Sequence, residues 1–260
     1  MTIWQAVVLG LVQGLTEFLP VSSSGHLVLA ERLLGVETPG VFVEVALHAA
    51  TLASVLVVFG RRLAALAVGV VHGRGEDLRY AALLLVATVP AGLVGVLLGD
   101  LVERAFDSLV LVGCGLVVTG GLLWLARRSG GQRPRPSAPG ALAIGAMQAL
   151  AVLPGVSRSG ATVSAGLLHG LSPARAAEFS FLMAVPVIAG AAMLEAREAA
   201  AEVARVGAVP LVVSCVVALA SGIWAIRFLV RLVERGRFHA FAPYCWGVGL
   251  LTIALSLWPG

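Results

Sequence analysis

Apolar stretches of roughly twenty residues recur along this chain, and they limit the fold more than any other feature of the sequence. Six of them occur, at residues 41–60, 80–99, 108–126, 178–194, 207–226 and 241–258. Each is close to the length that an α-helix needs to cross a bilayer, roughly 20 residues. The composition agrees, because 59% of the residues are hydrophobic and only 12% are charged. The sequence therefore predicts an all-α integral membrane protein with six transmembrane helices and no soluble domain.

Two further regions, residues 3–35 and 141–171, are each built from two shorter apolar pieces. Proline, serine and glycine interrupt these regions around Pro20 and Pro154. Apolar pieces of roughly 10–14 residues are typical of re-entrant segments rather than of spans. We therefore expect two re-entrant helix-turn-helix hairpins in addition to the six transmembrane helices.

The two hairpin regions are also copies of each other. At a constant offset of 135, residues 13–35 and 148–170 are identical at ten of 23 positions. The connections between the predicted spans alternate in charge: 61–79, 127–135 and 227–237 are basic, whereas 100–107 and 195–205 are mildly acidic. By the positive-inside rule, both termini lie outside, the first hairpin enters from the outer face and the second enters from the cytoplasm. Two such halves form an inverted-topology repeat, with the hairpin tips meeting near the midplane.

We interpret residues 1–260 as a single polytopic membrane domain. Its first repeat half is 1–129, its second is 141–260, and the Gly- and Pro-rich stretch 130–140 is a cytoplasmic linker between them. The net charge of +4 follows from the loop topology and predicts no nucleic-acid partner. The expected partners are membrane lipids, and the sequence leaves open whether the chain forms a homodimer.

The hairpin turns carry the polar and charged side chains of the predicted site. Ionisable groups at membrane depth are costly and indicate function, and Glu17, His26 and Arg158 are such groups. A Ser- and Gly-rich turn that opens a helix offers free backbone N–H groups to an anion, and an arginine fork suits phosphate oxygens. We therefore expect a phosphate or diphosphate ligand. The predicted substrate-binding residues are Gln13, Ser22, Ser24, Gly25, Ser157, Ser159, Gly160 and Thr162.

The predicted catalytic residues are Glu17, Ser23, His26 and Arg158. Glu17 lies on the helix face of Gln13, four residues earlier, and its carboxylate would bind a divalent metal ion, Mg or Ca, that bridges to the phosphate. Ser23, in the middle of the turn, is the preferred nucleophile, with a metal-activated water as the alternative. His26 would act as general acid or base.

Structural roles compete with these assignments. Glu17 and Arg158 could simply pair with each other and hold the halves together, and His26 could be a structural histidine. For four further ionisable residues near span ends we expect capping, snorkelling or local pairing: Glu44, His48, Arg175 and Glu178. Of these, only Glu44 is retained as a site candidate.

Two motifs resemble the signatures of a known family. They are QGLTEFLPVSSSGH, residues 13–26, and PGVSRSGAT, residues 154–162, and they are similar to the two signature motifs of the bacterial undecaprenyl-diphosphate phosphatases, the bacitracin-resistance family. The resemblance covers essentially the whole chain. It implies a metal-dependent hydrolase of the bacterial inner membrane that converts undecaprenyl diphosphate to undecaprenyl phosphate plus phosphate, with its active site open to the outer side. It also implies recycling of the carrier lipid of peptidoglycan synthesis, and hence bacitracin resistance.

Carried over by position, the resemblance assigns the essential acid, the suspected nucleophile, the catalytic histidine and the phosphate-holding arginine to Glu17, Ser23, His26 and Arg158. The chain departs from the family at two places. Gln13 stands where a glutamate is frequent, which removes one carboxylate from a metal site. Tyr244 and Cys245 stand where relatives usually have Tyr-Arg, and we assign no site role there.

An inverted repeat with broken helices at the midplane is also typical of secondary transporters. The alternative function is therefore a lipid-phosphate flippase that uses the same anion site. A hydrolase needs a nucleophile and a proton-transfer group in addition, and Ser23 and His26 supply them. We therefore favour the phosphatase.

Overall fold

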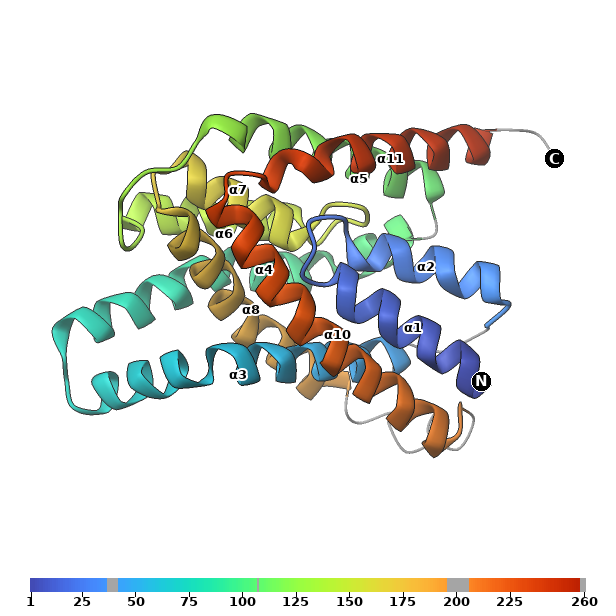
Figure 1. Cartoon of the computed structure of the whole chain (residues 1–260), viewed down its shortest axis with the longest axis horizontal. Coiled ribbons are helices and arrows are strands. Elements are labelled where there is room, and N and C mark those ends of the chain that lie inside the picture. The colour runs from blue at the N-terminus through green and yellow to red at the C-terminus, as the bar shows by residue number, and fades with distance from the viewer. Residues whose placement is uncertain (37–41, 107, 196–205, 258–260) are drawn as a thin grey trace.

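The computed structural model of the chain describes residues 1–36, 42–106, 108–195 and 206–257 (Figure 1). These residues contain no β-strand and one isolated β-bridge, between Arg133 and Leu171. The predicted all-α class is confirmed. The helices are α1 (Ile3–Thr16), α2 (Ser23–Leu34), α3 (Phe42–Val71), α4 (Gly75–Phe106), α5 (Leu109–Leu125), η1 (Ala126–Arg128), α6 (Ala138–Leu150), α7 (Arg158–Leu168), α8 (Pro173–Glu195), α10 (Ala208–Glu234), η3 (Phe238–Phe241) and α11 (Ala242–Leu257).

Among the described residues, five helical segments are long and apolar enough to cross a membrane, so the chain is a multi-pass membrane protein. The segments are Val43–Val71, Gly75–Gly99, Leu109–Arg128, Ala208–Glu234 and Phe238–Leu257. They correspond to five of the six predicted spans. The sixth, residues 178–194, falls in α8, which is not one of the five, and its crossing stays a prediction.

The connection predicted at 61–79 is wrong in extent. Helix α3 continues to Val71 and α4 begins at Gly75, so Arg61, Arg62 and Arg79 lie inside helices. Residues 63–71 are mostly leucine, alanine and valine without proline. Leucine and alanine favour helix strongly, so the span extends beyond the length that hydropathy alone suggested.

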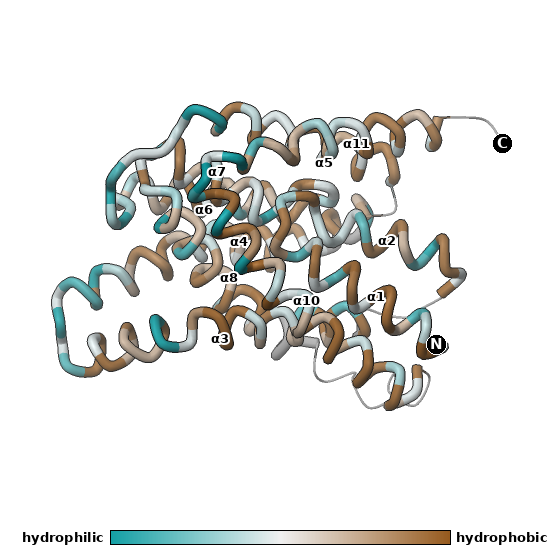
Figure 2. Tube along the Cα trace, viewed as in Figure 1, coloured by the Kyte–Doolittle hydropathy of each residue, from teal (hydrophilic) through white to brown (hydrophobic). Residues whose placement is uncertain are grey.

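The ends of the helices sort onto two sides of the molecule. Helix α1 begins and α11 ends on one side, at the right in Figure 1, and the α3–α4 connection and the arginine-rich stretch after α5 lie on the other. Figure 2 shows hydrophilic residues gathered at these connections and hydrophobic residues along the helices. This arrangement agrees with the predicted alternation of charge. Residues 196–205 of the acidic connection lie outside the described part of the chain.

Both predicted hairpins are present as packed helix pairs, α1 with α2 and α6 with α7. The first helix of each pair also packs on a long helix of the other predicted half, α1 on α10 and α6 on α4. A Cβ on Gly10 would lie 2.4 Å from the Ser214 carbonyl oxygen, and a Cβ on Gly145 would lie 2.5 Å from the Ala87 carbonyl oxygen. Gly10 and Gly145 are equivalent at the offset of 135. The close packing of the two halves therefore repeats along with the sequence.

The two hairpin tips are held inside the protein by neighbouring helices. A Cβ on Gly115 of α5 would lie 2.2 Å from the Pro154 carbonyl oxygen, so α5 lies directly against the second tip. Phe18, in the first tip, is fully buried and packs edge-on against Phe181 of α8, with ring centroids 5.7 Å apart. Apolar contacts thus fix the position of both polar turns.

The stretch 130–140 is only partly a linker. The Ser137 side chain accepts a hydrogen bond from the Gly140 N–H and caps α6, so residues 138–140 form its first turn. A serine cap followed by a proline in the first turn is a strong helix start. The connection between the halves therefore ends at Ser137.

Candidate active site

The first hairpin tip places Glu17 and Ser23 side by side. Helix α1 ends at Thr16, and Glu17 is its C-cap, whereas Ser23 is the first residue of α2. Between them Pro20 cannot donate a helical hydrogen bond, and Ser22 adopts a left-handed φ of 68°, so the chain reverses. The Ser23 hydroxyl donates to Glu17 Oε2 at 2.6 Å.

The second hairpin tip is built from a capped turn. Ser157 is the N-cap of α7, and its side chain accepts from the Gly160 N–H at 3.1 Å. Thr119 of α5 fixes this turn, because its hydroxyl accepts from the Ser157 N–H at 2.9 Å and donates to the Gly155 carbonyl at 3.1 Å. Arg158 is the first residue of α7, so the turn determines where the guanidinium group lies.

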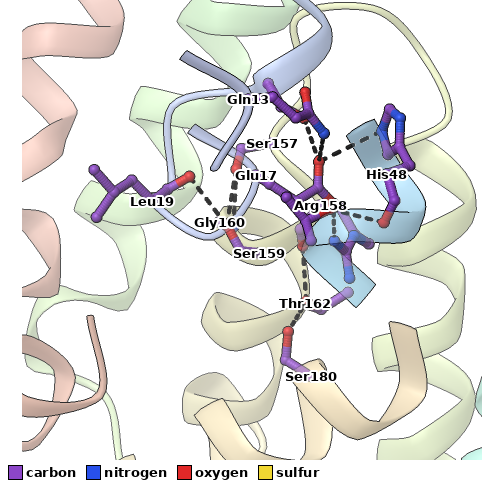
Figure 3. A network of polar contacts seen from close by, with 12 residues as sticks. Gln13, Glu17, Leu19, His48, Ser157, Arg158, Ser159, Gly160, Thr162 and Ser180 are labelled. Carbon is purple, nitrogen blue, oxygen red and sulfur yellow. Dashed lines mark hydrogen bonds and ion pairs between the residues drawn. The ribbon is translucent and has the colours of Figure 1, made fainter. Parts of the chain in front are cut away.

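The two tips meet through Glu17 and Arg158 (Figure 3). Arg158 Nη2 donates to Glu17 Oε1, and Glu17 is 6% exposed. Gln13 Nε2 donates to Glu17 Oε2 at 3.2 Å, and the Ser159 hydroxyl donates to the Leu19 carbonyl at 3.2 Å, from the second tip to the first. The structure therefore brings together four of the predicted site residues, Gln13, Glu17, Ser23 and Arg158.

His48, which the sequence predicted to cap, snorkel or pair locally, joins this cluster. His48, on α3, lies with Nε2 3.5 Å from Glu17 Oε2, and Figure 3 shows its ring directed at the carboxylate. Its Nδ1 donates to the Glu44 carbonyl at 2.7 Å, which fixes the ring. The shared helix face of Glu44 and His48 was visible in the sequence, but that pattern did not indicate which other element the face would meet.

His26 does not join the cluster. Its Nδ1 donates to the Ser22 carbonyl at 2.8 Å, and its Nε2 lies 2.7 Å from the Tyr244 hydroxyl. It is not among the residues that line the cavity beside Glu17. Its role as general acid or base stays a prediction.

The remaining predicted binding residues shape the turns. The Ser22 and Ser24 hydroxyls lie 3.3 Å apart. Gly25 packs close to α5, since a Cβ there would lie 3.3 Å from Val112 Cγ1. The Thr162 hydroxyl donates to the Arg158 carbonyl at 2.7 Å and lies 2.6 Å from the Ser180 hydroxyl, so this side chain is engaged within the protein.

A cavity of about 380 Å³ opens beside the cluster. Its polar part includes six of the predicted residues, Glu17, Ser22, Ser23, Ser24, Ser157 and Arg158. Glu44, His48 and Gln148 also line it, and its other walls are mostly apolar, formed by residues such as Ala91, Val152 and Ile188. A polar end joined to apolar walls suits a ligand with an anionic head and a hydrocarbon tail.

Comparison with known proteins identifies the family. A family model described as "Bacitracin resistance protein BacA" matches residues 6–251. The chain belongs to this family. The undecaprenyl-diphosphatase of Desulforapulum autotrophicum is 43% identical over 271 residues, which cover 97% of this chain and 98% of that protein. Those of Desulfosudis oleivorans and Rubrobacter xylanophilus are each 46% identical, again over 97% of this chain and 98% of theirs.

Three polar side chains at the site of this BacA family member have buried atoms without a hydrogen-bond partner. In the described part of the chain, Arg158 Nη1, Gln13 Oε1 and both amide atoms of Gln148 have no hydrogen-bond partner. Unpaired buried polar atoms are costly, and Arg158 and Gln148 line the cavity. Gln148 was absent from our predicted site, although it repeats Gln13 at the offset of 135.

The donors that the site offers to a hard divalent cation such as Mg²⁺ are oxygen atoms. No group of three His, Cys, Asp or Glu side chains suited to a metal occurs among the described residues. Glu17 supplies a carboxylate and Gln13 Oε1 a buried amide oxygen without a partner. Mg²⁺ commonly takes one or two protein oxygens and completes its shell with water and substrate phosphates, so Glu17 and Gln13 are the residues that would hold such an ion.

Arg175 and Glu178 lie in a separate ion-pair cluster, as predicted. Glu178 contacts Arg175 at 2.6 Å and Arg62 of α3 at 2.8 Å. The Arg62 guanidinium also lies over the Tyr80 ring, 5.0 Å from its centroid. This cluster ties α3, α4 and α8 together.

Proposed function

We propose that this chain is an undecaprenyl-diphosphatase, which hydrolyses undecaprenyl diphosphate to undecaprenyl phosphate and phosphate. The observation that carries the proposal is the meeting of Glu17, Ser23 and Arg158 at the polar end of an otherwise largely apolar cavity. The relatives named above have this activity in their names. Removal of undecaprenyl diphosphate is also the basis on which this BacA family member confers bacitracin resistance.

Arg158 binds the diphosphate through the nitrogen that is free. Its Nη2 contacts Glu17, whereas Nη1 is buried without a partner. A guanidinium fork can hold a carboxylate and a phosphate oxygen at the same time. Gln148 and the Ser157 hydroxyl line the same cavity and contribute further polar contacts.

Ser23 is the nucleophile in this proposal. Its hydroxyl already donates to Glu17 Oε2, so Glu17 accepts the proton as Ser23 Oγ bonds to the terminal phosphorus. The bond from that phosphorus to the bridging oxygen breaks, and undecaprenyl phosphate leaves with the electron pair. A water oxygen then bonds to the phosphorus of the phosphoserine and the bond from phosphorus to Oγ breaks. Inorganic phosphate leaves with the protons of that water, and Glu17 returns the first proton to Oγ. The general acid or base role predicted for His26 has no step in this scheme, because its two ring nitrogens lie on the Ser22 carbonyl and the Tyr244 hydroxyl. Direct attack by water is the alternative to Ser23.

We also propose a divalent metal cofactor, Mg or Ca. Glu17 and Gln13 Oε1 would hold it, and it would neutralise charge on the diphosphate. The substitution of glutamine for a second acid at Gln13 predicts weaker metal binding than a two-carboxylate site provides.

The proposed topology has six spans and two re-entrant hairpins in an inverted repeat. The equivalent packing of Gly10 and Gly145 supports the repeat. Helices α3, α4 and α5 cross an odd number of times, so the second half starts from the opposite face. With the arginine-rich connections in the cytoplasm, the protein lies in the bacterial inner membrane and its active site opens to the outer side. Exposed apolar side chains such as Val96 and Leu97 contact lipid or, in a homodimer, a second chain.

Phosphate release from undecaprenyl diphosphate by the purified protein in detergent tests the function. Glu17→Ala, Ser23→Ala and Arg158→Ala should each lower turnover by about a hundredfold or more. Ser256→Ala is the matched control, because that hydroxyl donates to the Ile253 carbonyl of its own helix. Near-normal turnover in all three variants would remove the catalytic assignment. Lipid transfer without phosphate release would favour the flippase instead.

The two chemical routes differ in what they leave on the protein. Attack by Ser23 gives a phosphoserine that rapid quenching traps and mass spectrometry locates. Full turnover with no adduct in quenched samples, together with residual activity in Ser23→Ala, would favour direct attack by water.

A further inference from the structure

Tyr244 contacts the one predicted catalytic residue that lies outside the Glu17 cluster. It lies on α11, 218 positions from His26, and its hydroxyl is 2.7 Å from His26 Nε2. The two rings also stack, with centroids 5.7 Å apart and planes 15° from parallel. No feature of the sequence placed Tyr244 at this turn.

The chemistry of His26 determines which atoms donate in this contact. The Ser22 carbonyl can only accept, so His26 Nδ1 carries a proton. In the neutral ring Nε2 is then the acceptor, and the Tyr244 hydroxyl donates to it. Tyr244 therefore favours the tautomer that binds Ser22.

Ser22 is the strained residue of the first tip. It is the one non-glycine residue with positive φ in the described part of the chain. Such a backbone is unfavourable for a residue with a side chain and needs support from its surroundings. The Ser22 carbonyl accepts from His26 twice, from the backbone N–H at 3.3 Å and from Nδ1 at 2.8 Å. His26 thus holds the turn that presents Ser23.

A second contact from α11 reaches the same turn. Cys245, next to Tyr244, is fully buried, and its thiol donates to the Pro20 carbonyl at 3.3 Å. Two consecutive residues of α11 therefore bind the tip, one at Pro20 and one through His26 at Ser22. The contact between α11 and the first tip therefore involves two neighbouring residues and not one isolated hydrogen bond.

We propose that Tyr244 is a positioning residue for the catalytic turn. By fixing the His26 tautomer, it keeps His26 Nδ1 on the Ser22 carbonyl and so keeps the Ser23 hydroxyl on Glu17. This inference rests on the proposed function, because Ser23 and Glu17 are the groups that it positions. It acts on the rate of the chemical step and not on substrate affinity, since Tyr244 does not line the cavity.

Tyr244→Phe tests the hydroxyl while it keeps the stacked ring. In the phosphate-release assay, kcat should fall about fivefold to tenfold, the effect expected for one lost hydrogen bond, with KM changed by less than about twofold. Tyr80→Phe is the matched control, because Tyr80 contacts the Glu178 cluster at 3.4 Å, away from the cavity. A Tyr244→Phe enzyme with wild-type kcat would overturn the inference, provided that the wild-type protein releases phosphate. If the wild-type protein releases none, the proposed function itself fails.

Nitrogen NMR of ¹⁵N-histidine-labelled protein gives a readout that does not depend on activity. His26 signals, assigned by their loss in His26→Asn, should show the Nδ1–H tautomer in the wild type and a mixture of tautomers in Tyr244→Phe. An unchanged tautomer in the variant would contradict the positioning role.

A double-mutant cycle tests the coupling from the other partner. Asparagine at position 26 can still donate to the Ser22 carbonyl but offers no ring nitrogen to Tyr244. In the His26→Asn background, Tyr244→Phe should therefore cause no further loss of kcat. A full additional loss would show that Tyr244 acts independently of His26 and would overturn the proposal.

Discussion

At the scale of single residues, the site is organised around one buried carboxylate. Glu17 has four neighbours, from three different parts of the chain: Gln13, Ser23, Arg158 and His48. A buried charge is tolerated only when paired and hydrogen-bonded. Each neighbour therefore has a structural role as well as a chemical one, and substitutions must be chosen to separate the two.

As the imidazolium, in which both ring nitrogens donate, His48 of α3 would bind Glu17 Oε2 through Nε2, which lies 3.5 Å away. His48→Ala should therefore impair catalysis. We expect a fall in kcat of about tenfold, equivalent to ~1.4 kcal/mol in the barrier, in the phosphate-release assay. His48→Gln, which can still donate to Glu17, should recover most of the lost kcat. The control is His72→Ala, because His72 makes the same ring-to-carbonyl bond, to Val68 at 2.8 Å, at an exposed position. Equal effects of His48→Ala and His72→Ala would contradict the role.

Arg158 should not tolerate lysine. Its two terminal nitrogens have different tasks, with Nη2 on Glu17 and Nη1 free for phosphate, and lysine has only one nitrogen. Arg158→Lys keeps the charge, yet kcat/KM should fall by about tenfold to a hundredfold. Arg175→Lys is the matched change in a pair with Glu178 that uses one nitrogen, and it should stay near wild type. Full activity in Arg158→Lys would show that charge alone suffices.

The sequence predicted the residues whose place is set locally. Proline, serine and glycine at each tip determine the turn, so Glu17, Ser23 and Arg158 were identified from their motifs alone. His48 and Tyr244 depend on how α3 and α11 lie against the hairpins. Membrane helices are apolar toward lipid and toward protein alike, so hydropathy does not show which face is buried. His26 was predicted as a general acid or base from its position in the motif, and the sequence did not indicate that its ring nitrogens would lie on Ser22 and Tyr244.

At the scale of helices, the second tip depends on glycine in α5. A Cβ at Gly115 would lie 2.2 Å from the Pro154 carbonyl oxygen and 2.8 Å from the Gly155 carbonyl carbon, so backbone must move. Gly115→Ala should push the tip away and shift Arg158 from Glu17, lowering both the thermal midpoint in detergent and turnover. Gly121→Ala, in the same helix with no atom within 4 Å, should leave both unchanged or raise the midpoint. An unchanged thermal midpoint and turnover in Gly115→Ala would contradict the prediction, because they would mean that α5 and the second tip can move apart at little cost.

At the scale of the whole molecule, the proposed inverted repeat makes a prediction about sidedness. The segment before α1 should face outward and the connection after α5 should face the cytoplasm, as the arginine-rich stretch requires. These two places lie on opposite sides of the molecule (Figure 1). The variants Thr2→Cys and Gln132→Cys place one label site on each side. Each is made in a chain whose native cysteines are replaced by serine or alanine, namely Cys114, Cys215 and Cys245.

A membrane-impermeant maleimide should label Thr2→Cys in intact spheroplasts and Gln132→Cys only after the membrane is permeabilised. The reason is that in the proposed topology α3, α4 and α5, each long and apolar enough to cross, separate the two sites by an odd number of crossings, whereas the hairpin of α1 and α2 would return to its own side. Labelling of both sites from outside would mean that the first hairpin crosses the membrane or that one of the three spans does not. The two tips would then no longer enter from opposite faces, and the shared site would need another explanation.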